Sequence, residues 1–347
     1  MLATADTYDE IEALVCVNPG ELRLERRPSP VRAEGEVLVR PRRIGICGTD
    51  YHIYEGKHPF LQYPRVMGHE LAVEVLDAPA GLDLSPGEIC VVNPYLSCGT
   101  CIACRAGKPN CCVSIAVLGV HRDGGMATLL SLPPANLIRA EGLGTDECAT
   151  VEFLAIGAHA VRRAHVSQGD RALVVGAGPI GMGTALFAQL SGAAVTLMDL
   201  DSERLAMIGG IVGAETIEGG EGSANRIAAA TSGEGFDVVF DATGNPSSME
   251  RGFDFVAPGG RYVFVSVVKG PITFEDPDFH RKELTLLGSR NAVAADFERV
   301  IAAIRSGEVP VAKIITHRTT LAEAERDLPV WASEKLGLIK AVVEVID

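Results

Sequence analysis

Residues 172–199 have the sequence ALVVGAGPIGMGTALFAQLSGAAVTLMD, and this stretch decides the fold of the second half of the 347-residue chain. Residues 172–198 carry no charge, and a membrane-spanning helix needs about 20 mainly apolar residues. Five glycines and a proline interrupt the run, so we predict instead a strand over 172–175, a glycine turn, a helix and a second strand over 194–198. Strands buried on both faces of a parallel sheet are continuously apolar in this way.

From residue 158 onward, strand-like runs alternate with helical patterns. Such alternation predicts an α/β fold, with a doubly wound parallel sheet covered by helices, here over residues 158–290. Further strands of this sheet are predicted at 237–241, 262–266 and 284–287.

Residues 1–157 have a different pattern, with short β-like runs separated by Gly and Pro. This pattern predicts an irregular, barrel-like β domain. The last part of the chain, 291–347, is expected to return to this first domain. The strands predicted for the first domain are 13–17, 36–43, 71–76 and 89–93, followed at the end of the chain by a helix over 294–306 and a strand over 339–345.

The glycine turn has the spacing of a dinucleotide-binding loop. It follows a predicted strand and opens a predicted helix, which is the context that a G-x-G-x-x-G motif requires. Gly176 allows the tight turn, Gly178 lets a pyrophosphate approach the backbone, and Gly181 lets the helix pack closely on the strand. A Rossmann-like fold that binds no cofactor is the alternative. The turn residues expected at the cofactor are Gly176, Gly178, Pro179, Ile180 and Gly181.

An acidic residue, Asp199, ends the strand that follows the turn. Its carboxylate is placed to accept hydrogen bonds from the adenosine ribose hydroxyls. Because a carboxylate repels a 2′-phosphate, we favour NAD over NADP. Arg204 lies close enough in sequence to keep NADP open, although an exposed position on a helix face is the other interpretation of this residue.

Four cysteines, Cys98, Cys101, Cys104 and Cys112, have the spacing C-x2-C-x2-C-x7-C. Two-residue gaps let a tight loop aim successive sulfurs at one point, and the longer gap lets the chain close a tetrahedron. We therefore predict a structural zinc site with four thiolate ligands. Reduced buried thiols and two disulfides are the alternatives, and Cys111 could replace Cys112 as the fourth ligand.

The N-terminal sequence and the net charge indicate an expected cellular location and argue against some classes of partner. The chain starts with MLATADTYDEIEAL, which has four acidic and no basic residues and so lacks the features of a secretory signal. A cytoplasmic location, where thiols stay reduced, is therefore expected. The formal net charge of −14 argues against nucleic acid or an anionic membrane as a partner. An acidic substrate would accordingly need a local basic pocket.

Cys47 and His69 form a second candidate metal site. They stand in the runs CGTD (47–50) and GHE (68–70), two separate loops whose side chains could meet at one zinc ion. A catalytic zinc has three protein ligands and one open position. The third ligand must come from elsewhere, and Glu152 is the best candidate. A lone His is more often a core residue, but the four-cysteine site and the dinucleotide turn favour the metal.

Four polar residues near these ligands have candidate roles. The Thr49 hydroxyl could relay the substrate proton, and His52 could pass that proton to solvent. A histidine in a surface loop is the alternative for His52. Asp50 could orient the imidazole of His69. Glu70 could support the site or replace a ligand during turnover.

In combination, these motifs resemble the zinc-containing medium-chain dehydrogenases of the alcohol, sorbitol and threonine dehydrogenase group, over essentially the whole chain. The resemblance implies a GroES-like barrel domain joined to a Rossmann domain, with two zinc ions per chain and NAD. It implies that Cys47, His69 and Glu152 hold the catalytic zinc, although many relatives have Pro where this chain has Phe153. The matching positions are Cys47, Thr49, His52, His69, Glu70, the four cysteines, Glu152, the 176–181 turn, Asp199 and the run Asp241-Ala242-Thr243-Gly244, of which Thr243 is expected at the cofactor.

The resemblance also implies a mechanism and an assembly. The metal acts as a Lewis acid on a substrate hydroxyl, and the proton leaves through Thr49, the nicotinamide ribose and His52. Hydride moves to NAD in a cleft between the domains. Homodimers or homotetramers through the sheet edge of the cofactor domain are expected.

A narrower resemblance is to bacterial L-galactonate dehydrogenases, which oxidise the hydroxyl at carbon 5 of a hexonate to give a keto acid. A sugar acid needs a basic partner for its carboxylate. Arg290 is the first candidate because it follows the last predicted strand of the sheet, and His121, Arg122 and then Lys57 come next. The segments that carry this resemblance are 59–60, 63–66, 110–112, 119–125, 158–163, 276–283 and 288–292.

Two other functions stay open. A polyol or L-threonine dehydrogenase would use the same zinc chemistry without a carboxylate site. A zinc- and NAD-binding protein without turnover is an alternative of another class, and the presence of both the ligand candidates and the relay candidates argues against it.

Overall fold

The computed structural model describes residues 9–58, 61–334 and 337–346. Pro59 and Phe60, which contribute to the narrower resemblance, and the first eight residues of the acidic start lie outside the described residues. Among the residues that are described, no helix combines the length and the apolar character needed to cross a membrane. The run 172–198 instead forms a strand, a turn, a helix and a second strand, as its glycines predicted.

The chain divides into two compact units. One unit contains the described residues up to Glu152 and those from Ile301 onward, and the other is Phe153–Val300. The sequence placed the corresponding boundaries at 157/158 and 290/291. Two helices, α4 (Val151–Arg163) and α10 (Ala294–Arg305), contain the points where the chain passes from one unit to the other.

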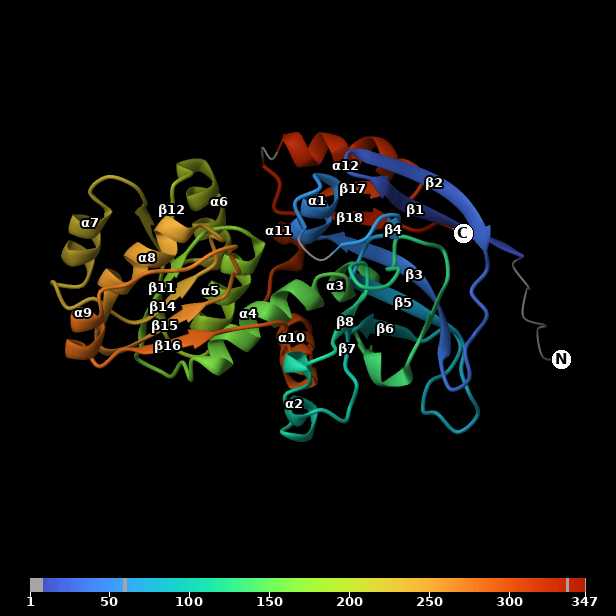
Figure 1. Cartoon of the computed structure of the whole chain (residues 1–347), viewed down its shortest axis with the longest axis horizontal. Helices are drawn as coiled ribbons and strands as arrows, with labels where there is room; N and C mark the ends of the chain where they lie inside the picture. The colour runs from blue at the N-terminus through green and yellow to red at the C-terminus, as the bar shows by residue number, and fades with distance from the viewer. Residues whose placement is uncertain (1–8, 59–60, 335–336, 347) are drawn as a thin grey trace. The chain divides into compact units, whose positions relative to one another are not determined.

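The second unit is built on a six-stranded, wholly parallel sheet with the order β13-β12-β11-β14-β15-β16. Figure 1 shows β11, β14, β15 and β16 side by side, with helices around them. The strand order reverses between β11 and β14, and a doubly wound sheet binds ligands beyond the carboxyl ends of its strands at such a point. The strands are β11 (Arg171–Val175), β12 (Ala194–Asp199), β13 (Glu215–Glu218), β14 (Phe236–Asp241), β15 (Val256–Phe264) and β16 (Thr285–Gly288), and the helices are α5 (Pro179–Leu190), α6 (Ser202–Val212), α7 (Ser223–Ala230), α8 (Pro246–Phe255) and α9 (Asp276–Arg281).

Local sequence explains where the helices of this unit begin and end. Helix α5 starts with Pro179 as its first residue, a position at which the missing N–H costs nothing. Helix α6 is capped by Asp201, whose side chain accepts hydrogen bonds from two backbone N–H groups of the first turn. It ends at Gly213, whose left-handed conformation (φ 74°) glycine adopts without strain.

The first unit is a β structure with two main sheets. The larger sheet has the order β10-β6-β5-β3-β18-β17, with β9 also paired to β3, and a smaller sheet has the order β2-β1-β4. Strand β18, near the C-terminus, pairs with β3 from the N-terminal part, so the end of the chain completes the first unit (Figure 1). Its strands are β1 (Glu10–Asn18), β2 (Glu21–Pro28), β3 (Val37–Ile46), β4 (Arg65–Val66), β5 (Glu70–Asp77), β6 (Ile89–Val92), β7 (Tyr95–Leu96), β8 (Ala116–Val117), β9 (Leu130–Leu132), β10 (Leu137–Arg139), β17 (Ile315–Thr320) and β18 (Lys340–Glu344), and its helices are α1 (Gly48–Tyr54), α2 (Ile102–Arg105), α3 (Thr145–Cys148), α11 (Val311–Ile314) and α12 (Ala324–Ser333).

Two of the strands that sequence analysis did not predict are polar edge strands. Strand β2 has the sequence ELRLERRP, with a single buried residue, Leu22, and is paired to β1 at the edge of its sheet. Strand β13 has the sequence ETIE and buries only Ile217. Apolar periodicity cannot reveal such edge strands, because hydrogen bonding to a neighbour rather than burial holds them in place.

Candidate metal centres and cofactor turn

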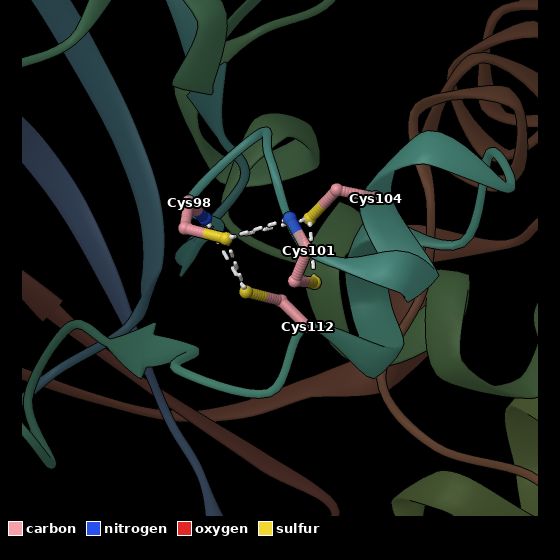
Figure 2. A group of neighbouring side chains, drawn as sticks. All are labelled: Cys98, Cys101, Cys104 and Cys112. Carbon is pink, nitrogen blue, oxygen red and sulfur yellow. Dashed lines mark hydrogen bonds between the residues drawn. The ribbon is translucent and has the colours of Figure 1, made fainter.

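The four cysteines lie in one lobe of the first unit, in the connection between β7 and β8. Figure 2 shows the side chains pointing toward a common centre. The sulfur–sulfur distances are 3.5 Å for Cys101–Cys104, 3.5 Å for Cys98–Cys112 and 4.0 Å for Cys98–Cys104. Four sulfurs placed tetrahedrally at about 2.3 Å from a zinc ion would be about 3.8 Å apart. The donor set therefore fits zinc.

The same geometry rules out the disulfide alternative. All nine cysteines are free, and separations of 3.5 Å or more far exceed the bond length of about 2.05 Å in a disulfide. Hydrogen bonds from the backbone and hydroxyl of Thr100 lower the pKa of Cys98 to about 5, whereas desolvation and the neighbouring sulfurs raise the pKa of Cys104 to about 11. A divalent cation would allow all four groups to be thiolates. Cys112, and not the adjacent Cys111, belongs to the group of four.

The second group of donors comes from two paired strands. Ligand atoms of Cys47, His69 and Glu70 lie within 4.8 Å of one another. Cys47 follows β3 and Glu70 begins β5, and these strands are paired antiparallel with Gly45 opposite Glu70. A Cβ atom at Gly45 would lie 2.2 Å from Oε2 of Glu70 and 2.9 Å from the carbonyl oxygen of Ala149. Glycine is thus required at position 45 for the strands to bring the donors this close.

Asp50 lies beside His69 and also holds the backbone of both ligand loops. Its Oδ1 lies 3.9 Å from Nδ1 of His69, which is too long for a hydrogen bond. Instead the fully buried carboxylate accepts hydrogen bonds from the backbone N–H groups of Cys47 (2.9 Å) and Gly68 (3.2 Å). Asp50 therefore ties together the two loops that carry Cys47 and His69 and positions the backbone of both.

Glu70 is held in a buried ion pair that sequence analysis missed. Nζ of Lys340, on β18, lies 2.7 Å from both carboxylate oxygens of Glu70 and 3.0 Å from the carbonyl oxygen of Ile46. Lys340 and Glu70 are 2% and 0% exposed. Burial opposes the ammonium form, but Glu70, together with the nearby Cys47 and Glu152, outweighs it and raises the pKa of Lys340. The available signal was a lysine at the start of a mostly apolar strand, where a buried charge needs a partner.

Glu152, the expected third ligand, lies in the first turn of α4 and is 1% exposed. It is not among the donors that lie within 4.8 Å of one another. Its Oε1 accepts a hydrogen bond from the hydroxyl of Tyr95, and its Oε2 has no hydrogen-bond partner among the described residues. Burial raises the pKa of Glu152 to about 7, against the opposing effect of His69. No sequence motif pointed to Tyr95.

The negatively charged groups around His69 favour the binding of a cation at this site. The ring is buried, and its Nδ1 has no hydrogen-bond partner within the described chain. Burial disfavours the imidazolium, yet the Cys47 thiolate and the Asp50 carboxylate together raise the pKa of His69 well above its ordinary value. A proton on the ring offsets part of that negative charge, and a divalent metal ion bound by Cys47 and His69 would offset more of it. The Cys, His and carboxylate donor set fits zinc.

The two relay candidates lie on α1. The hydroxyl of Thr49 is 3.7 Å from Sγ of Cys47 and half-buried. His52 is exposed. Residues three apart in a helix share one face, so a proton that reached Thr49 would have His52 as the next group toward solvent.

The glycine turn of the second unit has the shape that the motif predicted. A Cβ at Gly181 would lie 1.7 Å from the carbonyl oxygen of Gly176, so helix α5 can pack on β11 only with glycine at that position. Gly176 itself has φ 99° and would place a Cβ 3.1 Å from the backbone of Ala242. A Cβ at Gly178 would meet nothing within 4 Å. The protein's own packing therefore leaves open space at the N-terminus of α5, where a dinucleotide pyrophosphate fits.

The polar side chains beside the glycine turn form hydrogen bonds or ion pairs with neighbouring residues. Asp199 accepts hydrogen bonds from the backbone N–H groups of Ala177 (2.6 Å) and Asp201 (3.0 Å), which fixes its carboxylate at the turn. Arg204 lies 3.8 Å from Asp201, its i,i+3 neighbour on the exposed side of α6. Thr243 donates its hydroxyl proton to the buried Asp241 (2.7 Å), so it supports the loop that packs against the turn.

The four candidates for a substrate carboxylate are all exposed. His121 and Arg122 lie in the first unit, in the loop after β8, where Nδ1 of His121 accepts a hydrogen bond from the N–H of Val117 (3.1 Å). Arg290 lies in the second unit, just beyond the end of β16. Lys57 forms an exposed pair with Glu55 (2.9 Å).

Both parts of the chain match known protein families. Residues 33–142 match the alcohol dehydrogenase GroES-like domain, and residues 179–306 match the zinc-binding dehydrogenase family. Together with the parallel sheet of the second unit, these matches confirm the predicted fold of a GroES-like domain and a Rossmann domain.

Individual relatives cover nearly the whole chain. L-galactonate-5-dehydrogenase of Escherichia coli (strain K12) is 40% identical over 324 residues, which are 92% of this chain and 95% of that protein. L-threonine 3-dehydrogenase of Bacillus licheniformis is 30% identical, over 92% of this chain and 96% of that protein. The structure of the alcohol dehydrogenase RspB from Escherichia coli CFT073, complexed with NADH, matches with a TM-score of 0.90 at 28% identity, covering 97% of this chain and 99% of that one. The chain therefore belongs to the family of zinc-type alcohol dehydrogenases and is a zinc-dependent oxidoreductase.

Proposed function

We propose that this enzyme oxidises a secondary hydroxyl of a sugar acid of the L-galactonate type to a keto acid, with NAD as the hydride acceptor. The observation that carries the substrate class is the 40% identity to L-galactonate-5-dehydrogenase across both units. The Asp199 carboxylate, fixed at the glycine turn, and the pairing of Arg204 with Asp201 support NAD over NADP. We extend the proposal to a cytoplasmic homodimer or homotetramer.

Cys47, His69 and Glu152 are the residues we assign to the catalytic zinc, and the four cysteines of the lobe are those we assign to a structural zinc. The unpartnered atoms Nδ1 of His69 and Oε2 of Glu152 support the first assignment. When bound, the zinc supplies a Lewis acid for the substrate hydroxyl and NAD supplies the hydride acceptor. Lys340 keeps Glu70 neutralised beside the site, so Glu70 does not compete for the metal without breaking a buried ion pair.

Two side chains of the protein, Thr49 and His52, are assigned to transfer the proton of the substrate hydroxyl to solvent. Oγ1 of Thr49 is the group we assign to take the proton of the substrate hydroxyl, because it lies 3.7 Å from Sγ of Cys47. His52, exposed one helical turn later, releases that proton to solvent. Substituting Thr49→Val should therefore abolish turnover while zinc content stays unchanged, since Val keeps the shape of Thr and removes its hydroxyl.

A basic side chain must hold the substrate carboxylate, and we assign this to Arg290, with His121 and Arg122 as the alternative candidates. A hydrogen bond to a charged group contributes about 1.5–3 kcal/mol, which corresponds to roughly a 10- to 100-fold effect. Arg290→Leu should therefore lower kcat/KM for the sugar acid by about that factor and leave activity with any neutral polyol unchanged. Arg281→Leu, a change of another exposed arginine in the same unit, is the control.

The experiment that tests the function is the formation of reduced cofactor, followed at 340 nm, with NAD and a panel of substrates. The panel is L-galactonate, L-gulonate, D-altronate, sorbitol and L-threonine. Turnover confined to the sugar acids is the expected result. Turnover with sorbitol or L-threonine alone would overturn the substrate class and favour a polyol or threonine dehydrogenase, an alternative that the 30% identity to L-threonine 3-dehydrogenase supports.

A further inference from the structure

We propose that Tyr95 is a positioning residue for the catalytic zinc: its hydroxyl holds one oxygen of Glu152 and leaves the other as the metal ligand. The inference rests on the proposed role of Glu152 as a zinc ligand. Tyr95 is part of neither metal site as defined by its donors, and it lies just before the four-cysteine lobe.

The two oxygens of Glu152 are in different situations. Oε1 accepts the hydrogen bond of the Tyr95 hydroxyl, and Oε2 is buried with no hydrogen-bond partner among the described residues. Both side chains are nearly inaccessible, at 8% exposure for Tyr95 and 1% for Glu152. A buried acceptor without a partner costs about 1–3 kcal/mol, so a cation at Oε2 would relieve a cost that the fold otherwise bears.

The backbone of Tyr95 is fixed from several sides. Its N–H donates to Oδ1 of Asn93 (3.1 Å), and its carbonyl accepts a hydrogen bond from the side chain of Asn136 (3.4 Å). Asn136 also donates to the carbonyl of Asn93 (2.7 Å), so hydrogen bonds link Asn93, Tyr95 and Asn136 to one another. On the other side, Tyr95 is paired with Val117 of β8. The phenol therefore reaches Glu152 from a backbone that has little freedom to move.

The position of β7 and β8 connects this contact to the four-cysteine lobe. The lobe is the chain between these two strands, and Cys98 and Cys112 lie close to its two ends, with the N–H of Cys98 donating to Sγ of Cys112 (3.3 Å). Closure of the lobe around its metal thus keeps β7 beside β8 and keeps Tyr95 in place. Through Tyr95, the structural site supports the geometry of the catalytic one.

A carboxylate anchored at one oxygen cannot rotate to bind a metal through both oxygens. Partners of this kind usually change metal affinity by about 10- to 100-fold when they are removed. We expect Tyr95→Phe to keep the lobe metal and to lower the affinity of the catalytic site for zinc by at least about 10-fold, as measured by competition with a chelator. In the cobalt-substituted protein the d–d absorption bands of the catalytic site should shift, because these bands report ligand geometry.

The control is Tyr63→Phe. This change also removes a phenol hydroxyl from a hydrogen bond in the first unit, in this case to the carbonyl of Ile53, and it should leave both zinc affinity and cobalt spectrum unchanged. A second measurement needs no change at Tyr95. Zinc loading of the native protein should perturb the near-ultraviolet absorption of tyrosine, and Glu152→Ala should remove that perturbation. An unperturbed spectrum would count against the proposal.

A double substitution tests the positioning role of Tyr95 separately from the ligand role of Glu152. If Glu152→Ala lowers zinc affinity and adding Tyr95→Phe lowers it no further, Tyr95 acts through Glu152 as proposed. If Glu152→Ala lowers affinity and Tyr95→Phe alone does not, the positioning role is overturned while the ligand role stands. If Glu152→Ala leaves affinity unchanged, the ligand role fails and this inference fails with it.

Discussion

The buried pair of Lys340 and Glu70 gives the sharpest prediction about stability. Lys340→Met keeps most of the side-chain volume and removes the ammonium, which leaves the Glu70 carboxylate buried at 0% exposure beside the donors of the catalytic site. It also removes the hydrogen bond to the carbonyl of Ile46. Breaking a buried ion pair by removing one partner costs about 3–5 kcal/mol. At roughly 2–4 °C per kcal/mol for a domain of this size, the thermal midpoint should fall by about 10 °C.

The assay is thermal unfolding of the zinc-loaded protein, followed by circular dichroism. Lys313→Met is the matched control, because Lys313 is exposed in the same unit and its replacement should change stability by no more than about 0.5 kcal/mol. Adding Glu70→Gln to Lys340→Met should restore a large part of the lost stability, since the unpaired charge causes the loss. The reasoning is refuted if Lys340→Met behaves like the control, or if the second substitution restores nothing.

Three further predictions concern the turn, a buried aspartate and the lobe. Gly181→Ala should lower both thermal stability and NADH affinity, because its Cβ would meet the carbonyl oxygen of the turn at 1.7 Å; Gly178→Ala, with nothing within 4 Å, should keep stability and lose NADH binding, as calorimetry can show. The pKa of Asp296 is about 2, because hydrogen bonds from neighbouring side chains outweigh burial. Its depressed pKa stabilises the fold above about pH 4 by roughly 2 kcal/mol, and this contribution is lost as pH falls toward 2, so the stability difference from Asp296→Asn should shrink over that range in urea unfolding. Cys112→Ser should reduce zinc from two ions to one per chain by elemental analysis, whereas Cys111→Ser should keep both; equal loss in the two variants would contradict the assignment of the fourth ligand.

Much of the fold could be predicted because the informative segments carry their own local signals. The run around Gly176 and Gly181 identifies a strand, a turn and a helix by apolar continuity and glycine spacing, and the structure has these elements. Edge strands such as β13 gave no such signal, because their residues are held by a neighbour's hydrogen bonds and not by burial.

The candidate sites, like the fold, have features that the sequence could predict and features that it could not. The sequence by itself determined the candidates for metal and cofactor binding, since ligand chemistry resides in side-chain type and in the short spacing of Cys98 to Cys112 or of the glycine turn. Only the tertiary structure decided the partners of those residues. It paired Glu70 with Lys340 from the far end of the chain, gave one oxygen of Glu152 to Tyr95, and set Asp50 on two backbone N–H groups. The physical reason is that a buried charge or polar atom must be satisfied by whatever the fold brings near it, and strand pairing between distant segments determines that neighbour.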